Sequence, residues 1–157
     1  MENKMKTSTN FNYNDGGRSE AGYKGNTGDC VTRSIAIATE IPYQEVYDTM
    51  FRLGGEYAES HRGEVANHIK KYGASPRNGV FKEIYKPYIE SLGCVWTPTM
   101  FIGQGCKFHL REDELPKGRL IVSVSKHITC VIDGVINDLH DCSRNGTRCV
   151  YGYWEKK

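Results

Sequence analysis

The chain has 157 residues, with 21 basic and 19 acidic side chains and a formal net charge of +2 at pH 7. This length favours one domain that buries its own core without the help of disulfides or metals. Because the charges are nearly balanced, the composition excludes a strongly basic nucleic-acid binder and gives no reason to expect a membrane-surface partner. The 10 tyrosines and 2 tryptophans come without a basic stripe, and they are typical of the edges of a core.

No apolar run reaches the ~20 residues that a membrane helix needs, and the first 20 residues lack the apolar centre of a signal peptide. We therefore expect a cytoplasmic protein whose six cysteines are thiols by default. The same segment is rich in Asn, Ser, Thr and Gly, which predicts a flexible N-terminal arm over residues 1–20. Residues 21–157 are expected to form a single domain.

The first half of this domain is predicted to be helical. Apolar residues recur at helical spacing behind Asp29, a residue that can cap a helix N-terminus. Pro42 ends this helix and suits the first turn of the next one, which is expected to stop at the Gly54–Gly55 pair. Two further helices are predicted, over residues 63–72 and 80–92.

After residue 93 the pattern changes to β-branched and aromatic runs, which are typical of strands. These runs are CVWTPTMFI, GRLIVSVSKHITCVID, GVINDLHD and RCVYGYW. Helices followed by strands predict an α+β fold, in which N-terminal helices pack on a C-terminal antiparallel β-sheet.

One predicted hairpin carries titratable side chains. The Asp133–Gly134 pair between β-branched residues indicates a two-residue turn. With that turn, His127, Thr129, Asp138 and His140 share one face, because side chains alternate along a strand. His127 and Asp138 then become diagonal neighbours, roughly 7–8 Å apart at the backbone, a separation that their side chains can bridge. A carboxylate beside an imidazole fixes its tautomer and stabilises its protonated form.

Cys30 lies where the first predicted helix begins. The N–H groups at a helix N-terminus have no partner within the helix and carry a partial positive charge, so they favour thiolate over thiol. Cys30, His127 and Asp138 would then supply a nucleophile, a general base and a group that orients the base. The backbone N–H of Cys30 is itself a candidate oxyanion donor.

These motifs, in this order, resemble the papain-like cysteine peptidase superfamily. The match consists of GDC at the start of an apolar helix and HITCVIDGVINDLHD late in the chain, within residues 22–154. The pattern is most similar to the C39-like branch and to compact bacteriophage-encoded proteins of this type. The resemblance implies a papain-like fold, with Cys30 as the nucleophile, His127 as the base and Asp138 as the third member of the triad.

The resemblance also implies a function. It predicts a cysteine-dependent hydrolase (a peptidase, isopeptidase or amidase) that forms an acyl-enzyme and needs no cofactor. Its implied partner is a protein or peptide substrate. For a phage-encoded protein, that substrate would be a host protein and the location would be the host cytoplasm.

Two departures from the family pattern concern the oxyanion hole. The family usually has a Gln, and sometimes an Asn, several residues before the cysteine, but the usual spacing falls near Lys24 here. The only close amide is Asn26, to which we assign the oxyanion role. The cysteine is also followed by Val31 in place of the glycine or serine common among relatives. The alternative is therefore a catalytically weak papain-like binding protein, such as a phage protein that captures a host factor.

Other interpretations stay open for individual residues. Cys30 could be a buried packing residue, and His140 could screen the His–Asp pair, act as a second base or lie exposed. Cys142 and Cys149 could form a disulfide, or they could bind zinc with Cys94, Cys106 or His109. A zinc-stabilised interaction module is therefore a third possible function. The spacing of Cys142 and Cys149 matches no compact zinc motif, so no metal is predicted. Substrate specificity is expected to lie in residues 54–62, 73–79 and 98–107.

Overall fold

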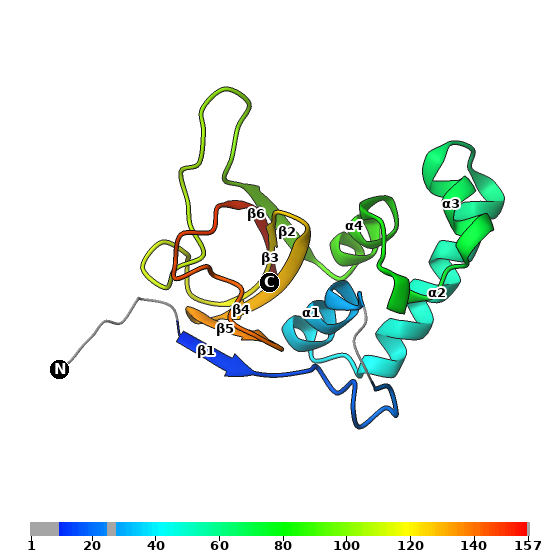
Figure 1. The fold of residues 1–157 in the computed structure, drawn as a ribbon, viewed down its shortest axis with the longest axis horizontal. Coiled ribbons are helices and arrows are strands. Elements are labelled where there is room, and N and C mark those ends of the chain that lie inside the picture. Colours follow the sequence, from blue (N-terminus) through cyan, green and yellow to red (C-terminus); the bar gives the residue numbers. More distant parts are fainter. Residues whose placement is uncertain (1–9, 25–27, 157) are drawn as a thin grey trace.

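The computed structural model describes residues 10–24 and 28–156 (Figure 1). Its helices are α1 (Cys30–Thr39), α2 (Tyr43–Ser60), α3 (Glu64–Tyr72), α4 (Lys82–Ser91) and the short 3-10 helix η1 (Pro76–Asn78). Its strands are β1 (Asn10–Tyr13), β2 (Cys94–Pro98), β3 (Arg119–Val124), β4 (His127–Ile132), β5 (Val135–Asp138) and β6 (Val150–Lys156). The predicted α+β class is confirmed. Within the described ranges, no helix combines the length and the apolar character that crossing a membrane requires.

The six strands form one sheet in the order β1-β5-β4-β3-β6-β2. The pairings from β5 across to β2 are antiparallel, whereas β1 pairs with β5 in parallel. The prediction of a purely antiparallel sheet is therefore wrong at this edge. Residues 10–13 belong to the sheet and not to a flexible arm, because main-chain pairing and the Asn12–Asn137 side-chain hydrogen bond (2.8 Å) stabilise a short edge strand. Its aromatic side chains, Phe11 and Tyr13, remain exposed.

The sheet separates two apolar clusters, because alternate residues of each strand point to opposite faces. On one face, Ile121 and Cys130 pack against α1, whose residues 31–38 are all buried. On the other face, Leu120 packs with Leu110 from the connection between β2 and β3. Figure 1 shows α1 directly against the sheet, α4 beside β2, and α2 and α3 farther out. This packing holds the N-terminus of α1 beside β4.

Helix α2 is longer than predicted. It runs through the Gly54–Gly55 pair and ends at Ser60. The pair does not end the helix, because both residues keep helical conformations and only later does the chain turn at His61 into an extended conformation. Gly54 has a packing reason, since a Cβ built on it would lie 3.2 Å from the Cβ of Ala74.

Replacing Gly55 by alanine should stabilise the protein by about 0.5–1 kcal/mol, the usual cost of a glycine within a helix. A Cβ on Gly55 meets nothing within 4 Å. Gly54→Ala is the matched control, because its helical gain is offset by the close contact with Ala74. Urea unfolding of both variants measures the difference. A Gly55→Ala variant less stable than wild type would contradict this account of α2.

The long apolar run over residues 119–132 forms two strands, β3 and β4, and not one. The chain reverses at Ser125 and Lys126, where Lys126 adopts a left-handed conformation with φ 58°. Val124 pairs with His127 across this turn. As a result His127 becomes the first residue of β4, at the end of the sheet that faces the start of α1.

The next turn follows the prediction from the sequence. Asp133 (φ 49°) and Gly134 (φ 83°) both adopt the positive φ of a two-residue hairpin turn. Ile132 pairs with Val135 across it, so the predicted register is confirmed. Because the register follows from turn length and alternation alone, the face shared by His127, Thr129 and Asp138 could be read from the sequence.

Two of the cysteines are not thiols in the structure. Cys106 and Cys149 form a disulfide across a sequence separation of 43 residues. The expectation of thiols throughout is wrong for this pair, and so is the suggested partnership of Cys149 with Cys142. The antiparallel bridge between His109 and Cys149 brings the β2–β3 connection beside the start of β6. Cys149 therefore pairs with Cys106 and not with Cys142.

Candidate active site

Cys30 is the first residue of α1, as the sequence predicted, and it lines an open groove. The walls of the groove come from the start of α1, residues 79–82 with Tyr85, and the turn between β3 and β4. The Cys30 side chain is half-buried, so a substrate can reach it from the groove. Its N–H belongs to the first helical turn, where N–H groups have no acceptor within the helix.

His127 reaches the same groove from the other side. The turn before it is held in place by Arg148, whose guanidinium donates to the carbonyl oxygens of Ser125 and Cys142. His127 and Cys30 line the same groove, and His127 lies close enough to lower the pKa of the Cys30 thiol. The structure therefore brings together two residues that are 97 positions apart, from 30 to 127 in the numbering.

Asp138 holds the other edge of the imidazole. Nε2 of His127 donates to Oδ2 of Asp138 at 2.8 Å, which leaves Nδ1 as the ring nitrogen that the carboxylate does not engage. Thr129 Oγ1 donates to the same carboxylate oxygen at 2.7 Å, and the Leu139 N–H donates to Oδ1 at 2.7 Å. Asp138 is almost wholly buried, so these bonds fix both the carboxylate and the ring that it orients.

The titration of these groups matches a thiolate–imidazolium pair. Burial acts to raise the pKa of Cys30, but the hydrogen bond and the charge of His127 outweigh it, and the pKa is lowered. Burial likewise acts to lower the pKa of His127, but its hydrogen bonds with Asp138, Cys142 and Cys30 raise that pKa to about 11. For Asp138, the hydrogen bonds from His127 and Thr129 overcome the effect of burial and bring its pKa well below the ordinary value.

A buried arginine anchors Asp138 from the helix side. Arg33, one turn after Cys30, donates through Nη1 to Asp138 Oδ1 at 2.7 Å and through Nε to Asp29 Oδ1 at 2.9 Å. Asp29 also accepts the hydroxyl of Tyr43 at 2.6 Å and pairs with Arg18 at 3.4 Å. Asp29 stands at the N-cap but its side chain makes no capping hydrogen bond, so its predicted capping role is wrong.

The sequence-based reasoning missed Arg33 and Cys142. Arg33 follows Asp29 at the i,i+4 spacing of an ordinary surface ion pair, and its position three residues after Cys30, on the same side of the helix, was the available signal. Cys142 is buried, and its Sγ lies 3.7 Å from Asp138 Oδ2. No signal in the sequence distinguishes Cys142, because it follows β5 in a loop.

The predicted oxyanion residue Asn26 lies outside the described residues. The chain on both sides of it is tied to η1. Arg77 Nη2 donates to the Lys24 carbonyl at 2.6 Å, and the Gly28 N–H donates to the Arg77 carbonyl at 2.8 Å. The groove therefore has one wall whose position depends on Arg77.

The expected groove walls are only partly correct. Gly79 lines the groove, but residues 54–60 belong to α2 and residues 100–105 line a separate hollow with Tyr151. His140 is exposed, and its ring centre lies 5.9 Å from that of His127. Of its three interpretations, this placement fits the last, an exposed residue near the His127–Asp138 pair.

Two groups of side chains have the composition of metal ligands. In the part of the chain that the structure describes, they are Cys106 with His109 and Cys149, and His127 with Asp138 and Cys142. In the second group the carboxylate is already engaged by Arg33 and Thr129, which suits a group that orients a base. The first group plays no part in the groove.

Comparison of the chain with protein-family models, with curated proteins and with solved structures returns no match. The functional argument therefore rests on the geometry of Cys30, His127 and Asp138.

Proposed function

We propose that this protein is a thiol hydrolase of the papain-like type, with Cys30 as nucleophile, His127 as acid and base, and Asp138 as the orienting carboxylate. The observation that carries the proposal is that Cys30 and His127 line one open groove, while the buried Asp138 carboxylate holds the His127 ring at 2.8 Å. His127 is also close enough to lower the pKa of the Cys30 thiol. Nucleophile, base and orienting group within hydrogen-bond reach are what nucleophilic catalysis requires.

In the first half of the reaction, the Cys30 thiolate attacks the carbonyl carbon of an amide or thioester. The oxyanion that forms accepts a hydrogen bond from the backbone N–H of Cys30 at the start of α1. The His127 imidazolium gives its Nδ1 proton to the leaving amine or thiol as the bond to the carbonyl carbon breaks. The products are a thioester on Cys30, the released amine or thiol, and a neutral imidazole.

In the second half, neutral His127 takes a proton from water, and the resulting hydroxide attacks the thioester. The thiolate leaves, the acid product departs and the imidazolium is restored. The pKa of His127 must fall once the thiolate has been consumed, because the charge of Cys30 is one of the causes that raise it. This coupling lets the same ring act first as an acid and then as a base.

The test is the fate of an activated acyl ester. Wild-type protein mixed with p-nitrophenyl acetate should release more than one equivalent of nitrophenol, and mass spectrometry should find a transient acetyl group on Cys30. Cys30→Ser should abolish both signals. Cys94→Ser serves as the matched control, because that buried thiol lies at the start of β2 and does not line the groove, and it should retain acylation at Cys30.

A permanent acetyl group on Cys30 without further turnover would instead favour the alternative, a papain-like binding protein with an incomplete oxyanion hole. Absence of any adduct on Cys30 would refute the assignment of Cys30 as a nucleophile.

A further inference from the structure

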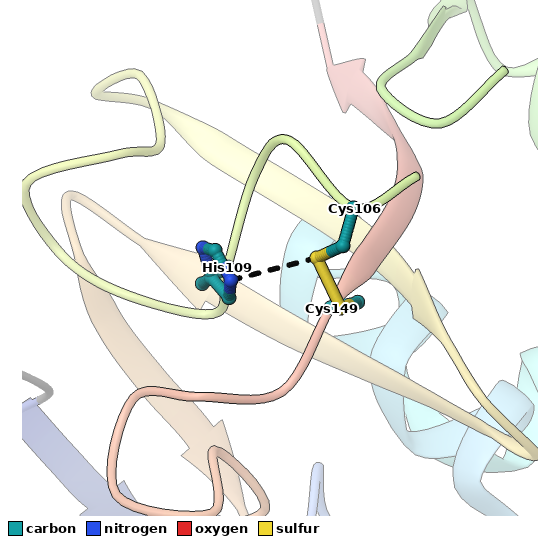
Figure 2. Close-up of side chains that lie close together, drawn as sticks. All are labelled: Cys106, His109 and Cys149. Atoms are coloured by element: carbon teal, nitrogen blue, oxygen red, sulfur yellow. Dashed lines mark hydrogen bonds between the residues drawn. A yellow bond between two sulfur atoms is a disulfide. The ribbon is translucent and has the colours of Figure 1, made fainter. Parts of the chain in front are cut away.

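The three residues Cys106, His109 and Cys149 form a second cluster that the proposed function does not use. Cys106 and His109 belong to the connection between β2 and β3, and Cys149 directly precedes β6. Figure 2 shows the His109 ring pointing its edge at the sulfur of Cys106 beside the disulfide. Each of the three residues is partly exposed, so the cluster is open to ions and to reductants from solution.

The distance between the donor atoms of His109 and Cys106 is that of two ligands on one small metal ion. Nε2 of His109 lies 3.5 Å from Sγ of Cys106. A thiolate at about 2.3 Å and an imidazole at about 2.05 Å from a tetrahedral zinc lie about 3.6 Å from each other. The three donor atoms all fall within 4.8 Å of one another.

The orientation of His109 is also that of a metal ligand. Its Nδ1 is hydrogen-bonded to Glu114 Oε1 at 3.1 Å, and its backbone N–H donates to the same oxygen at 2.9 Å. Arg111 in turn pairs with the other Glu114 oxygen at 3.3 Å. A carboxylate on the distal nitrogen of a histidine fixes its tautomer and leaves the opposite nitrogen free to bind a metal.

We propose that the reduced form of this cluster is a zinc site, with Cys106, Cys149 and His109 Nε2 as ligands and Glu114 as the carboxylate behind the histidine. Two sulfurs and one imidazole favour zinc over hard cations such as Mg²⁺ or Ca²⁺. The three residues leave the fourth tetrahedral position to water, which their partial exposure admits.

Zinc binding requires that the disulfide first be reduced. One dithiol reductant transfers two electrons and two protons to the Cys106–Cys149 bond, giving two thiols and the oxidised reductant. Zn²⁺ then displaces the two thiol protons, and the sulfurs move to about 3.8 Å apart, as two thiolates on one tetrahedral zinc require. The disulfide and the zinc site each link the β2–β3 connection to β6, so the fold keeps a cross-link here in either redox state.

The test is metal binding by the full-length protein after reduction with a phosphine, which does not chelate metal. Reduced wild type should bind one equivalent of zinc with a rise in melting temperature, and cobalt should give the charge-transfer and visible bands of tetrahedral thiolate coordination. Glu114→Gln should weaken binding about 10–100-fold, and His109→Ala should weaken it more. His109 is about one-third exposed, so its replacement should leave the fold intact, which circular dichroism checks.

Cys142→Ser is the control for the second group of possible ligands, His127 with Asp138 and Cys142. This variant should bind cobalt as wild type does. The proposal is overturned if the reduced protein binds no metal, or if His109→Ala binds it unchanged. It is also overturned if binding is lost in Cys142→Ser while His109→Ala retains it, because the metal would then lie beside His127. These outcomes do not depend on whether Cys30 is catalytic.

Discussion

Iodoacetamide should alkylate Cys30 of the native protein at pH 6 on the order of 100-fold faster than it alkylates Cys30 in a His127→Ala variant. The thiolate is the reactive form, and the hydrogen bond and charge of His127 are what lower the pKa of Cys30 against the effect of burial. Without His127 the effect of burial remains, which raises the pKa. The wild-type rate should therefore decline at a lower pH than the rate of the variant. Peptide mapping identifies the alkylated cysteine.

His140→Ala is the matched control for this measurement. It removes a second imidazole, whose ring centre lies 5.9 Å from that of His127, but which is exposed. Its alkylation rate should stay within about threefold of wild type. Cys94 and Cys130 are internal references, because burial raises the pKa of both thiols. Equal rates for wild type and His127→Ala would mean that no thiolate–imidazolium pair exists.

Arg33→Ala should lower the free energy of unfolding by about 3–5 kcal/mol, the usual effect of removing one partner from a buried ion pair. The change removes one of the two cationic partners of the buried Asp138 carboxylate, the other being His127, and one of the partners of Asp29. Urea unfolding at neutral pH measures the loss. In acid, the carboxylates that have lost Arg33 take up protons in the variant. In wild type, the contribution of ionised Asp138 to stability also declines below about pH 4, because the pKa of Asp138 is lower in the folded than in the unfolded protein. The difference between the two proteins should therefore narrow as the pH falls.

Arg52→Ala is the matched control, because it makes the same substitution in a helix. Arg52 pairs with Glu56 at i,i+4 on α2, and the two side chains are 60% and 58% exposed. An exposed pair of this kind contributes little, so the control should lie within about 0.5 kcal/mol of wild type. If Arg33→Ala were as mild as Arg52→Ala, Arg33 could not be what anchors Asp138.

Arg33 also connects stability with the chemistry of the site. It holds Asp138, which in turn orients His127. We expect Arg33→Lys to retain more stability than Arg33→Ala, but to lose the two-pronged contact that a planar guanidinium makes with Asp29 and Asp138. In our interpretation Arg33 is a positioning residue, since it contacts the carboxylate and not the reacting thiol.

The parts of the fold that could be predicted are those with a local cause. The hairpin from His127 to Asp138 depends on a two-residue turn and on alternation, and its register was correct for that reason. Helix α1 was placed from its apolar repeat and from Pro42. The prediction ended helix α2 at Gly54, because a glycine pair usually marks a helix end. In the structure the helix continues, and the contact with Ala74 is the reason for a glycine at position 54.

The amino-acid sequence by itself determined the α+β class, the position of Cys30 at a helix start and the pairing of His127 with Asp138, since each depends on neighbours close along the chain. Tertiary structure decided the contacts between distant segments. It placed Cys30 beside His127, attached Arg33 to Asp138, added β1 to β5 and brought Cys106 to Cys149. The physical reason is that these contacts come from the packing of α1 on the sheet and of the loops around it. The neighbouring residues in the sequence do not show whether a charged side chain or a thiol lies on the surface or beside a partner from a distant segment.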